Sequence, residues 1–451
     1  MDRVRIMTPT GMLGAGWDEA TIERGLALGV DVIAVDGGST DSGPYYLGSA
    51  TAKTTAQAVA RDLRSLLNAA ARANVPLIVG SCGTSGTDAG VDWVAGIAAE
   101  VMAEEGLELG VARIYSEQSA AALTAQLDRI HPLPPLGDLT AETLESCTHI
   151  VGMMGHAPIV EALRAGAQVV LAGRATDTAV AAAFALLHGM PAGPTWHASK
   201  IVECGGQCTT DPRNGGVHTT IDATGFTIEP LSPDSACTPF TVAAHMLYET
   251  VNPFEMREPD GTLDVRDATY VAVDERTVRV EGSRFHPAGQ HTIKLEGARI
   301  TGYETTSFTA IRDPLILADV EGWAGLLRHH LRVRVTQTLG LTDDEYAFDV
   351  RLYGHNAVLD ALEFEAGPPR EVGVMLVVEA SDQATATAVA KVANPLMLHL
   401  PAAGMPYLPS LAFAGSPAET ERGPAYEFVL NHVVDSGPTD LFRIEYGATP
   451  R

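Results

Sequence analysis

The N-terminal part of the chain alternates short, β-rich apolar runs with longer, alanine-rich amphipathic stretches. The apolar runs cover residues 3–7, 31–35, 76–79, 111–115, 148–153 and 168–171, and helix-like stretches at 18–28, 54–73, 92–105, 119–130 and 159–165 separate most of them. A strand, a helix and a second strand in this order are typical of parallel βαβ units. The sequence therefore predicts an α/β fold, with a mostly parallel sheet and flanking helices. An open doubly wound sheet is favoured over part of a barrel, because eight equal repeats cannot be counted.

The pattern of predicted secondary structure changes at two positions further along the chain, so we expect three regions. Residues 1–200 form the parallel α/β domain that we expect to carry the site. In residues 201–318 helical periodicity fades and short alternating segments appear, which predicts a β-rich middle region. Residues 319–451 combine a helix-like stretch, a strand and a capped helix, which predicts an α+β C-terminal region.

Composition and charge argue against several classes of protein. Of 451 residues, 46% are hydrophobic and 19% charged, which is typical of a globular protein, and the formal net charge is -26. So acidic a surface repels nucleic-acid phosphates and anionic lipids, so we expect neither as a partner, and an anionic substrate needs a local positive site.

The five cysteines are few and odd in number, which favours a reducing compartment. With no signal-peptide pattern and no long apolar span, we expect a cytoplasmic protein.

Polar and glycine-rich loops follow nearly every predicted strand, where ligands bind in parallel α/β sheets. These loops are residues 8–16, 36–46, 80–88, 116–118, 155–156 and 173–177. Turn and helix-cap chemistry explains any one of them. The connections from helix to strand, such as residues 28–30, carry few polar residues by comparison. Because the polar loops gather at one edge of the predicted sheet, we expect a ligand site there.

The expected substrate-binding residues lie in these loops and just beyond them. Arg174 is the natural cation for a substrate carboxylate, and the alternative is a structural ion pair with Asp177. Loop 80–86 could present backbone N–H groups to an anion. The other candidates carry hydroxyl, carboxyl or thiol groups or are glycine: Thr10, Ser39, Thr40, Ser81, Gly83, Thr84, Ser85, Glu117 and Cys204.

Four residues are the candidates for catalysis. His156 follows a predicted strand and is a candidate acid or base, with a capping or buried histidine as the alternative. Glu203 is a second candidate for moving a proton. Asp36 is expected to orient water or a metal, and Cys82 is a candidate reactive thiol.

The sequence leaves the cofactor open. Loop 80–86 lacks the Gly-Lys-Ser/Thr of a Walker motif and residues 11–16 do not match G-x-G-x-x-G, so no nucleotide motif is found. Magnesium or manganese at Asp36 and Asp41 competes with the interpretation of these carboxylates as solvated helix caps, which we prefer. Cys204 and Cys208 form a lone C-x3-C without a second ligand pair, which is a weak zinc pattern.

Three segments of the chain resemble the acyclic terpene utilisation (AtuA-like) family, formerly a domain of unknown function. They are residues 159–177, ending in Gly-Arg and Asp; residues 201–207, which read Ile-Val-Glu-Cys-Gly-Gly-Gln; and residues 246–249, Met-Leu-Tyr-Glu, with Asn-Pro close behind. The resemblance runs to about residue 400. It implies a role in the catabolism of branched terpenoid acids and points to Arg174, Asp177, Glu203 and Cys204.

The chain departs from the family pattern in two places, residues 235–239 and 36–41, and both count against a terpene substrate. Many relatives continue into a small extra C-terminal domain, so the resemblance also implies a separately encoded small partner subunit. We expect a homo-oligomer.

These observations predict a catabolic enzyme, a hydratase or dehydratase (a carbon–oxygen lyase), acting on a hydroxy or unsaturated carboxylic acid or its CoA thioester. Arg174 and loop 80–86 would stabilise the enolate-like charge while His156 or Glu203 moves the proton. The alternative is a non-catalytic ligand-binding or scaffold subunit that needs a small partner protein. A third interpretation, a sugar- or nucleotide-phosphate enzyme, rests on the glycine loops alone. An α/β hydrolase is disfavoured because no G-x-S-x-G appears.

Overall fold

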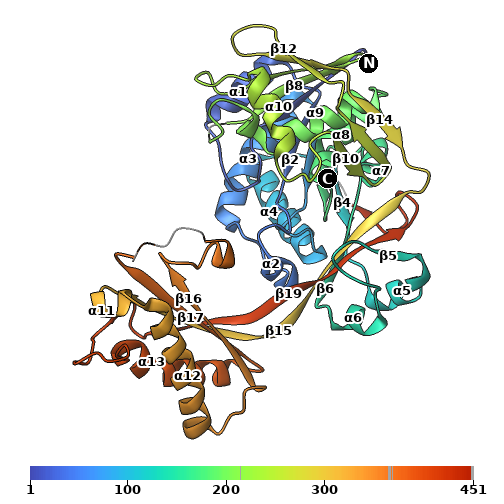
Figure 1. Ribbon diagram of the computed structural model, residues 1–451. Helices are drawn as coiled ribbons and strands as arrows, with labels where there is room; N and C mark the ends of the chain where they lie inside the picture. Colours follow the sequence, from blue (N-terminus) through green and yellow to red (C-terminus); the bar gives the residue numbers. More distant parts are fainter. Residues whose placement is uncertain (214, 364–366, 368, 448–451) are drawn as a thin grey trace. The chain divides into compact units, whose positions relative to one another are not determined.

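The computed structural model describes residues 1–213, 215–363, 367 and 369–447, and the chain divides into two compact units (Figure 1). Unit 1 comprises Met1–Arg299 and Phe428–Arg451, and unit 2 comprises Ile300–Glu427. Two long strands, β15 (Thr292–Ile311) and β19 (Glu419–Asp435), contribute residues to both units. The mixed α/β class predicted from the sequence is confirmed. The three predicted regions have boundaries at other positions than these two units.

A ten-stranded sheet runs through unit 1, and its central strands are parallel. The parallel strands lie in the order β1 (Arg3–Thr8), β2 (Val32–Asp36), β3 (Leu77–Gly80), β7 (Val169–Ala172) and β4 (Val111–Tyr115). Beyond β1 the sheet continues through antiparallel strands from the middle of the chain: β8 (Val217–Asp222), β9 (Gly225–Pro230), β13 (Val278–Glu281) and β12 (Thr269–Ala272). Beyond β4 it ends at antiparallel β20 (Arg443–Tyr446). Part of the predicted β-rich region therefore extends the same sheet.

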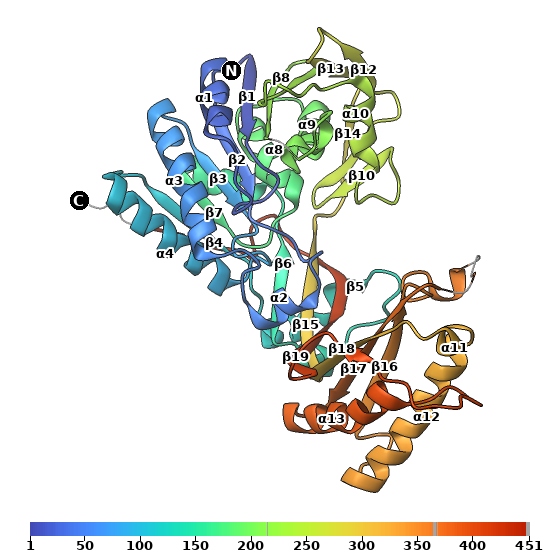
Figure 2. The same ribbon diagram turned by 90° about the vertical axis from the view of Figure 1, so that its left-hand side faces the viewer.

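Helices cover both faces of the parallel strands, as Figure 2 shows with α3 (Ala56–Ala73) and α4 (Asp88–Glu105) on one side and α8 (Asp177–Leu187) and α9 (Ala192–Val202) on the other. One face packs on α1 (Glu19–Leu28), α3 and α4, and the other on α7 (Ala157–Arg164), α8 and α9. In β2, Ile33 and Val35 contact the first set, whereas Val32 and Ala34 contact the second. All of β2 is buried, which explains why its sequence is apolar without alternation.

One predicted strand lies outside the parallel sheet. Residues 148–153 do form a strand, β6 (His149–Met153), but it pairs antiparallel with β15, with Met153 opposite Lys294. The place beside β3 is taken by β7. The small elements α5 (Ala120–Thr124), η1 (Leu127–Arg129), β5 (Ile130–Pro132) and α6 (Ala141–Ser146) precede β6 in the chain. The residue after β6 nevertheless lies beside the loop that follows β7, because Met154 forms a parallel bridge with Ala175.

Short elements complete unit 1. They are α2 (Pro44–Ser49), η2 (Gly205–Cys208), α10 (Pro239–Ala244), η3 (His245–Leu247), and a three-stranded antiparallel sheet of β10 (Glu255–Glu258), β11 (Gly261–Asp264) and β14 (Arg284–Pro287). The segment that contains η2 follows α9 directly, which brings it to the same end of the sheet as the loop after β1.

Unit 2 is an antiparallel sheet covered by helices. Its strand β17 (Val372–Ala380) lies between β16 (Tyr346–Tyr353) and the second half of β15 and pairs with both, and β18 (Ala412–Phe413) also pairs with β15. Buried and half-buried residues alternate along β17, and the buried ones share a core with α12 (Val320–Leu339) and α13 (Gln383–His399). Two short elements, α11 (Pro314–Leu317) and η4 (Asp360–Leu362), complete the unit. Among the described residues, no helix is both long and apolar enough to span a bilayer.

Candidate functional site

Unit 1 contains a polar cavity of about 580 Å³ at the carboxyl ends of β1 and β2. Its walls come from the loops after these strands, the start of α8, the segment around η2, and the residues that follow η3. The lining residues are Thr10, Gly11, Met12, Ala15, Gly16, Asp36, Gly38, Ser39, Asp41, Ser42, Lys53, Asp177, Cys204, Gly206, Gln207, Pro212, Arg213, Gly215, Tyr248 and Glu249. A ligand site at this edge is what the one-sided polar loops predict.

A second cavity, of about 500 Å³, lies between α1 and α3 and is lined by charged side chains. Its arginines are paired: Arg72 bonds to Glu23 and Arg64 to Glu105, with N–O distances of 2.6 and 2.8 Å. These are ordinary surface ion pairs, and the chemistry-bearing residues lie at the first cavity.

Two glycines allow the loops of the cavity to touch through their backbones. A Cβ on Gly11 would lie 2.8 Å from the carbonyl oxygen of Cys204, so the loop after β1 packs directly on the segment after α9. Gly38 has φ +141°, and a Cβ there would lie 2.6 Å from the Cα of Thr84. Asp36, at the end of β2, and Cys204 both line the cavity.

Asp36 and Asp177 are carboxylates at the wall of the cavity with unusual protonation behaviour. Asp36 is 7% exposed; its Oδ2 accepts a hydrogen bond of 3.2 Å from the Gly38 N–H, and its Oδ1 has no partner among the described residues. Burial, followed by the charge of Asp177, raises the pKa of Asp36 well above its ordinary value. Burial also raises the pKa of Asp177, while Arg174 lowers it.

Arg174 is held inside the protein by Glu296 and by the start of α8. Its Nε donates to Glu296 Oε2 at 2.9 Å, and its Nη1 lies 3.4 Å from Asp177 Oδ1. The same Nη1 donates to the Ala175 carbonyl at 2.9 Å, and the residue is 5% exposed and does not line the cavity. The ion pair with Asp177, which the sequence offered as the alternative, is therefore present.

Glu296 completes this arrangement from β15. Burial alone would raise the pKa of Glu296, but Arg174 and Lys294 lower it to about 2. Lys294 Nζ donates to Glu296 Oε1 at 3.0 Å and Thr40 Oγ1 to Oε2 at 3.2 Å. The charge of Arg174 is thus matched mainly by Glu296.

Lys200 and Glu203 form a second buried ion pair at the end of α9. Lys200 Nζ donates to Glu203 Oε1 at 2.5 Å, and the two residues are 5% and 6% exposed. Burial raises the pKa of Glu203 well above its ordinary value, Lys200 opposes that rise, and Asp177 adds to it. Lys200 Nζ also lies 5.6 Å from the centre of the Tyr248 ring.

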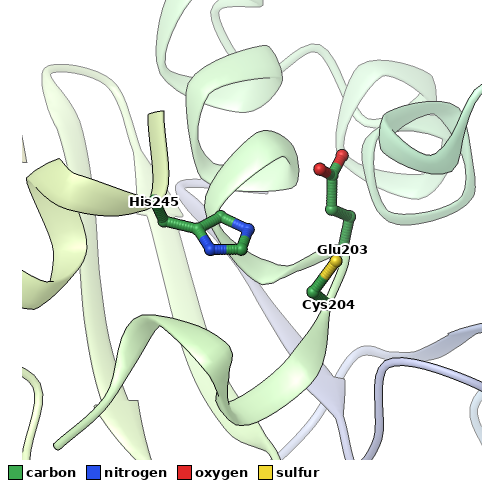
Figure 3. Close-up of side chains that lie close together, drawn as sticks. All are labelled: Glu203, Cys204 and His245. Carbon is green, nitrogen blue, oxygen red and sulfur yellow. The ribbon is translucent and has the colours of Figure 1, made fainter. Parts of the chain in front are cut away.

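Cys204 and His245 lie next to Glu203, as the close-up in Figure 3 shows, with the imidazole of His245 pointing from η3 toward the other two side chains. One potential ligand atom of each of these three residues lies within 4.8 Å of the others. Cys204 is half-buried and lines the cavity, whereas His245 is 5% exposed and stacks on Tyr248. Burial and the nearby Lys200 lower the pKa of His245 to about 4, so its imidazole is neutral at physiological pH.

Glu258 adds a further buried carboxylate from β10. Thr176 Oγ1 and Thr178 Oγ1 donate to its two oxygens at 3.0 and 2.6 Å. Burial raises the pKa of Glu258 to about 8, although both threonines oppose the rise. The charge of Glu258 in turn contributes to the raised pKa of Glu203.

Part of the residue set predicted from the sequence comes together here. Thr10, Ser39, Asp36, Asp41, Asp177 and Cys204 line the cavity, and Glu203 lies beside Cys204.

The remaining predicted residues do not line it. Cys82, Ser81, Thr84 and Ser85 are buried below the loops, and burial raises the pKa of the Cys82 thiol. Gly83 packs against Gly90, and Thr40 bonds to Glu296. In loop 80–86, the N–H groups of Ser81 and Cys82 already donate to the carbonyls of Gly173 and Ala172.

Two further predicted residues, His156 and Glu117, do not line the cavity. His156 has its Nδ1 3.7 Å from Asp260 Oδ2 and packs edge-on against Trp196, away from the cavity lining. Glu117 bonds to the His149 ring and accepts a hydrogen bond from the Asp88 N–H, so it is part of a local ion pair.

Lys53 and Arg213 of the cavity lining were not found from the sequence, and neither were four buried residues around it: Lys200, His245, Glu258 and Glu296. For Lys200 a signal was present, because it stands three residues before Glu203, a spacing that places both on one face of a helix. The other three buried residues come from segments far away in the chain.

The family model described as acyclic terpene utilisation family protein AtuA matches residues 4–417. The chain belongs to this family. No curated protein and no solved structure matches the chain. The match to the AtuA family confirms the resemblance found in the sequence, and it covers every residue of the cavity.

Proposed function

We propose that this AtuA-family chain is a catabolic hydro-lyase, which adds water to or removes water from a hydroxy or unsaturated carboxylic acid or its CoA thioester. The observation that carries the proposal is the pair of carboxylates with raised pKa values, Asp36 and Asp177, at the wall of a polar cavity. Acid–base enzymes commonly use two groups whose surroundings push their pKa values apart.

The two carboxylates have different surroundings, and we assign them different roles on that basis. Arg174 contacts Asp177 at 3.4 Å and opposes the rise that burial causes in its pKa, so we assign Asp177 as the base that removes a proton from carbon. Asp36 has an unpartnered oxygen and a strongly raised pKa, which makes it the acid that protonates the leaving hydroxyl. In the hydration direction the same two proton transfers run backwards.

The substrate's negative group needs a cation that is free of the buried network. Arg174 is engaged by Glu296 and Asp177, so we assign this task to Lys53 and Arg213, the cations among the lining residues. Lys53 Nζ donates to Ser42 Oγ at 3.0 Å, which holds the ammonium at the wall. These cations provide the local positive site that an anionic substrate requires on so acidic a chain.

The experiment is an NMR screen of the purified full-length chain in D₂O with a panel of hydroxy acids, unsaturated acids and their CoA thioesters. The proposal predicts that at least one compound gains or loses water and takes up deuterium at the carbon next to the carbonyl. The Asp36→Asn and Asp177→Asn variants should lose this activity. A chain that binds an acid, as judged by thermal shift, but converts none would instead favour the scaffold subunit that needs a small partner.

A further inference from the structure

We propose that Glu203, Cys204 and His245 form a binding site for one divalent transition-metal ion, best suited to zinc, at the wall of the cavity. The three side chains supply a carboxylate oxygen, a thiol sulfur and an imidazole nitrogen, all within 4.8 Å of one another. Thiolate, imidazole and carboxylate are the ligands that zinc takes in proteins, and three protein ligands with one open position are typical of catalytic zinc.

His245 supplies an independent reason to expect a ligand. The residue is only 5% exposed, and its buried Nε2 has no hydrogen-bond partner among the described residues. A buried ring nitrogen without a partner is costly, and a native protein normally satisfies it. Since the ring points toward Glu203 and Cys204 in Figure 3, a metal ion between the three side chains would satisfy it.

The charges around the cluster also favour a cation. The carboxylates of Asp177, Glu258 and Glu249 surround Glu203 and Cys204, and Lys200 is the cation that acts on both residues. Arg174 does not restore the balance because Glu296 already pairs with it. Zinc binds cysteine as the thiolate, so metal binding at Cys204 releases the thiol proton to solvent.

The position of the cluster gives the ion access to a substrate. Cys204 lines the cavity and Glu203 and His245 stand behind it, so an ion held by all three borders the cavity. Only Oε1 of Glu203 bonds to Lys200 in the described chain, which leaves Oε2 for the metal. The ion could then polarise a carbonyl or hydroxyl oxygen of a substrate. This role rests on the proposed function, whereas metal binding does not.

The test uses the full chain freed of metal with a chelator and titrated with Co²⁺, which reports its ligands through its absorption spectrum. We expect one equivalent to give the intense visible bands of tetrahedral cobalt and a sulfur-to-cobalt charge-transfer band, both of which Zn²⁺ removes by competition. Cys204→Ala should abolish the charge-transfer band. Cys204→Ala and His245→Ala should each weaken zinc binding at least about 100-fold, since even residues that only support a ligand contribute 10–100-fold.

Cys208→Ser is the matched control, because Cys208 is a buried thiol in the same segment but lies outside the cluster. It should keep the cobalt spectrum. The account is overturned by a wild-type chain without a charge-transfer band, or by a band that persists in Cys204→Ala. The wild-type spectrum alone decides the matter if a variant fails to fold. If the chain binds zinc but converts no acid, the metal site stands and the proposed function is wrong. If the chain is equally active after chelation, the proposed function stands and the metal has no role in it.

Discussion

Lys200 and Glu203 form a buried ion pair across one turn at the end of α9, with the ammonium 2.5 Å from the carboxylate. Glu203 belongs to the segment that identified the family in the sequence, and Cys204 follows it at the cavity wall. The pair therefore links the stability of α9 to the site, and it is the first feature to test by mutation.

Lys200→Met should destabilise the protein by about 3–5 kcal/mol, because it leaves the Glu203 carboxylate buried without a partner. Urea unfolding at neutral pH measures this loss. The double variant Lys200→Met with Glu203→Leu should recover much of it, since no charge is then left buried. For comparison, Arg64→Met removes an exposed pair with Glu105 and should cost less than about 1 kcal/mol. Equal losses at the two positions would contradict the assignment of a tightly buried pair.

Glu258 should make the protein less stable as the solution becomes alkaline. Burial raises the pKa of Glu258 from 4.5 to about 8, so the folded state holds this proton more tightly than the unfolded chain does. Its contribution to stability is fully present below pH 4.5 and is lost as the pH rises through 8, at roughly 1.4 kcal/mol for each pH unit.

The measurement is urea unfolding of wild type and Glu258→Gln at several pH values across this range. Relative to wild type, Glu258→Gln should become more stable as the pH rises. Glu255→Gln, at an exposed position of the same strand, should follow the wild-type dependence. A Glu258→Gln profile parallel to wild type would contradict the raised pKa.

The Arg174→Lys variant should show whether Arg174 positions Asp177 or binds the substrate carboxylate. Lysine keeps the charge but loses the planar fork that reaches both Glu296 and Asp177. If Arg174 orients the base Asp177, kcat should fall by roughly 10–100-fold while KM changes little, because small misplacements of a catalytic group are costly. A rise in KM with unchanged kcat would instead restore Arg174 as the direct ligand of the substrate carboxylate.

Gly11→Ala should disturb the site through a backbone contact. The new Cβ would lie 2.8 Å from the Cys204 carbonyl oxygen, so the loop after β1 or the Cys204 segment must shift. We expect a loss of turnover and a lower melting temperature. Gly96→Ala is the control, because Gly96 lies inside α4 with no atom within 4 Å of the added carbon, and it should stabilise the helix by about 0.5–1 kcal/mol. Full activity in Gly11→Ala would contradict the close approach of the two loops.

Local patterns were sufficient for most of the parallel strands and for the edge of the sheet that borders the polar cavity. Strands such as β2 are buried throughout, and their apolar sequence shows it. Helix caps also explain some of the polar loops, since Thr87 and Thr176 accept hydrogen bonds from the N–H groups at the starts of α4 and α8. The pattern could not show that β6 pairs with β15, because that partner lies about 140 residues later in the chain.

The same physical reason explains which site residues were missed. Asp36 ends β2, Asp177 begins α8 and Cys204 follows closely after α9, so their positions follow from local order. His245, Glu258 and Glu296 reach the site from segments whose placement depends on tertiary packing. Arg174 was found, but its partner Glu296 was not, and only that partner shows that the guanidinium is already engaged.

Proton transfer by Asp177 is the central claim, and deuterium uptake from D₂O tests it most directly. Wild type, Asp177→Asn and Asp41→Asn are compared on the same substrate by NMR; Asp41 lines the same cavity but is exposed and bonded to Ser39. The account predicts uptake at the carbon next to the carbonyl with wild type and Asp41→Asn, and a loss of at least about 100-fold with Asp177→Asn, the scale of general acid–base catalysis. Undiminished uptake with Asp177→Asn would contradict it.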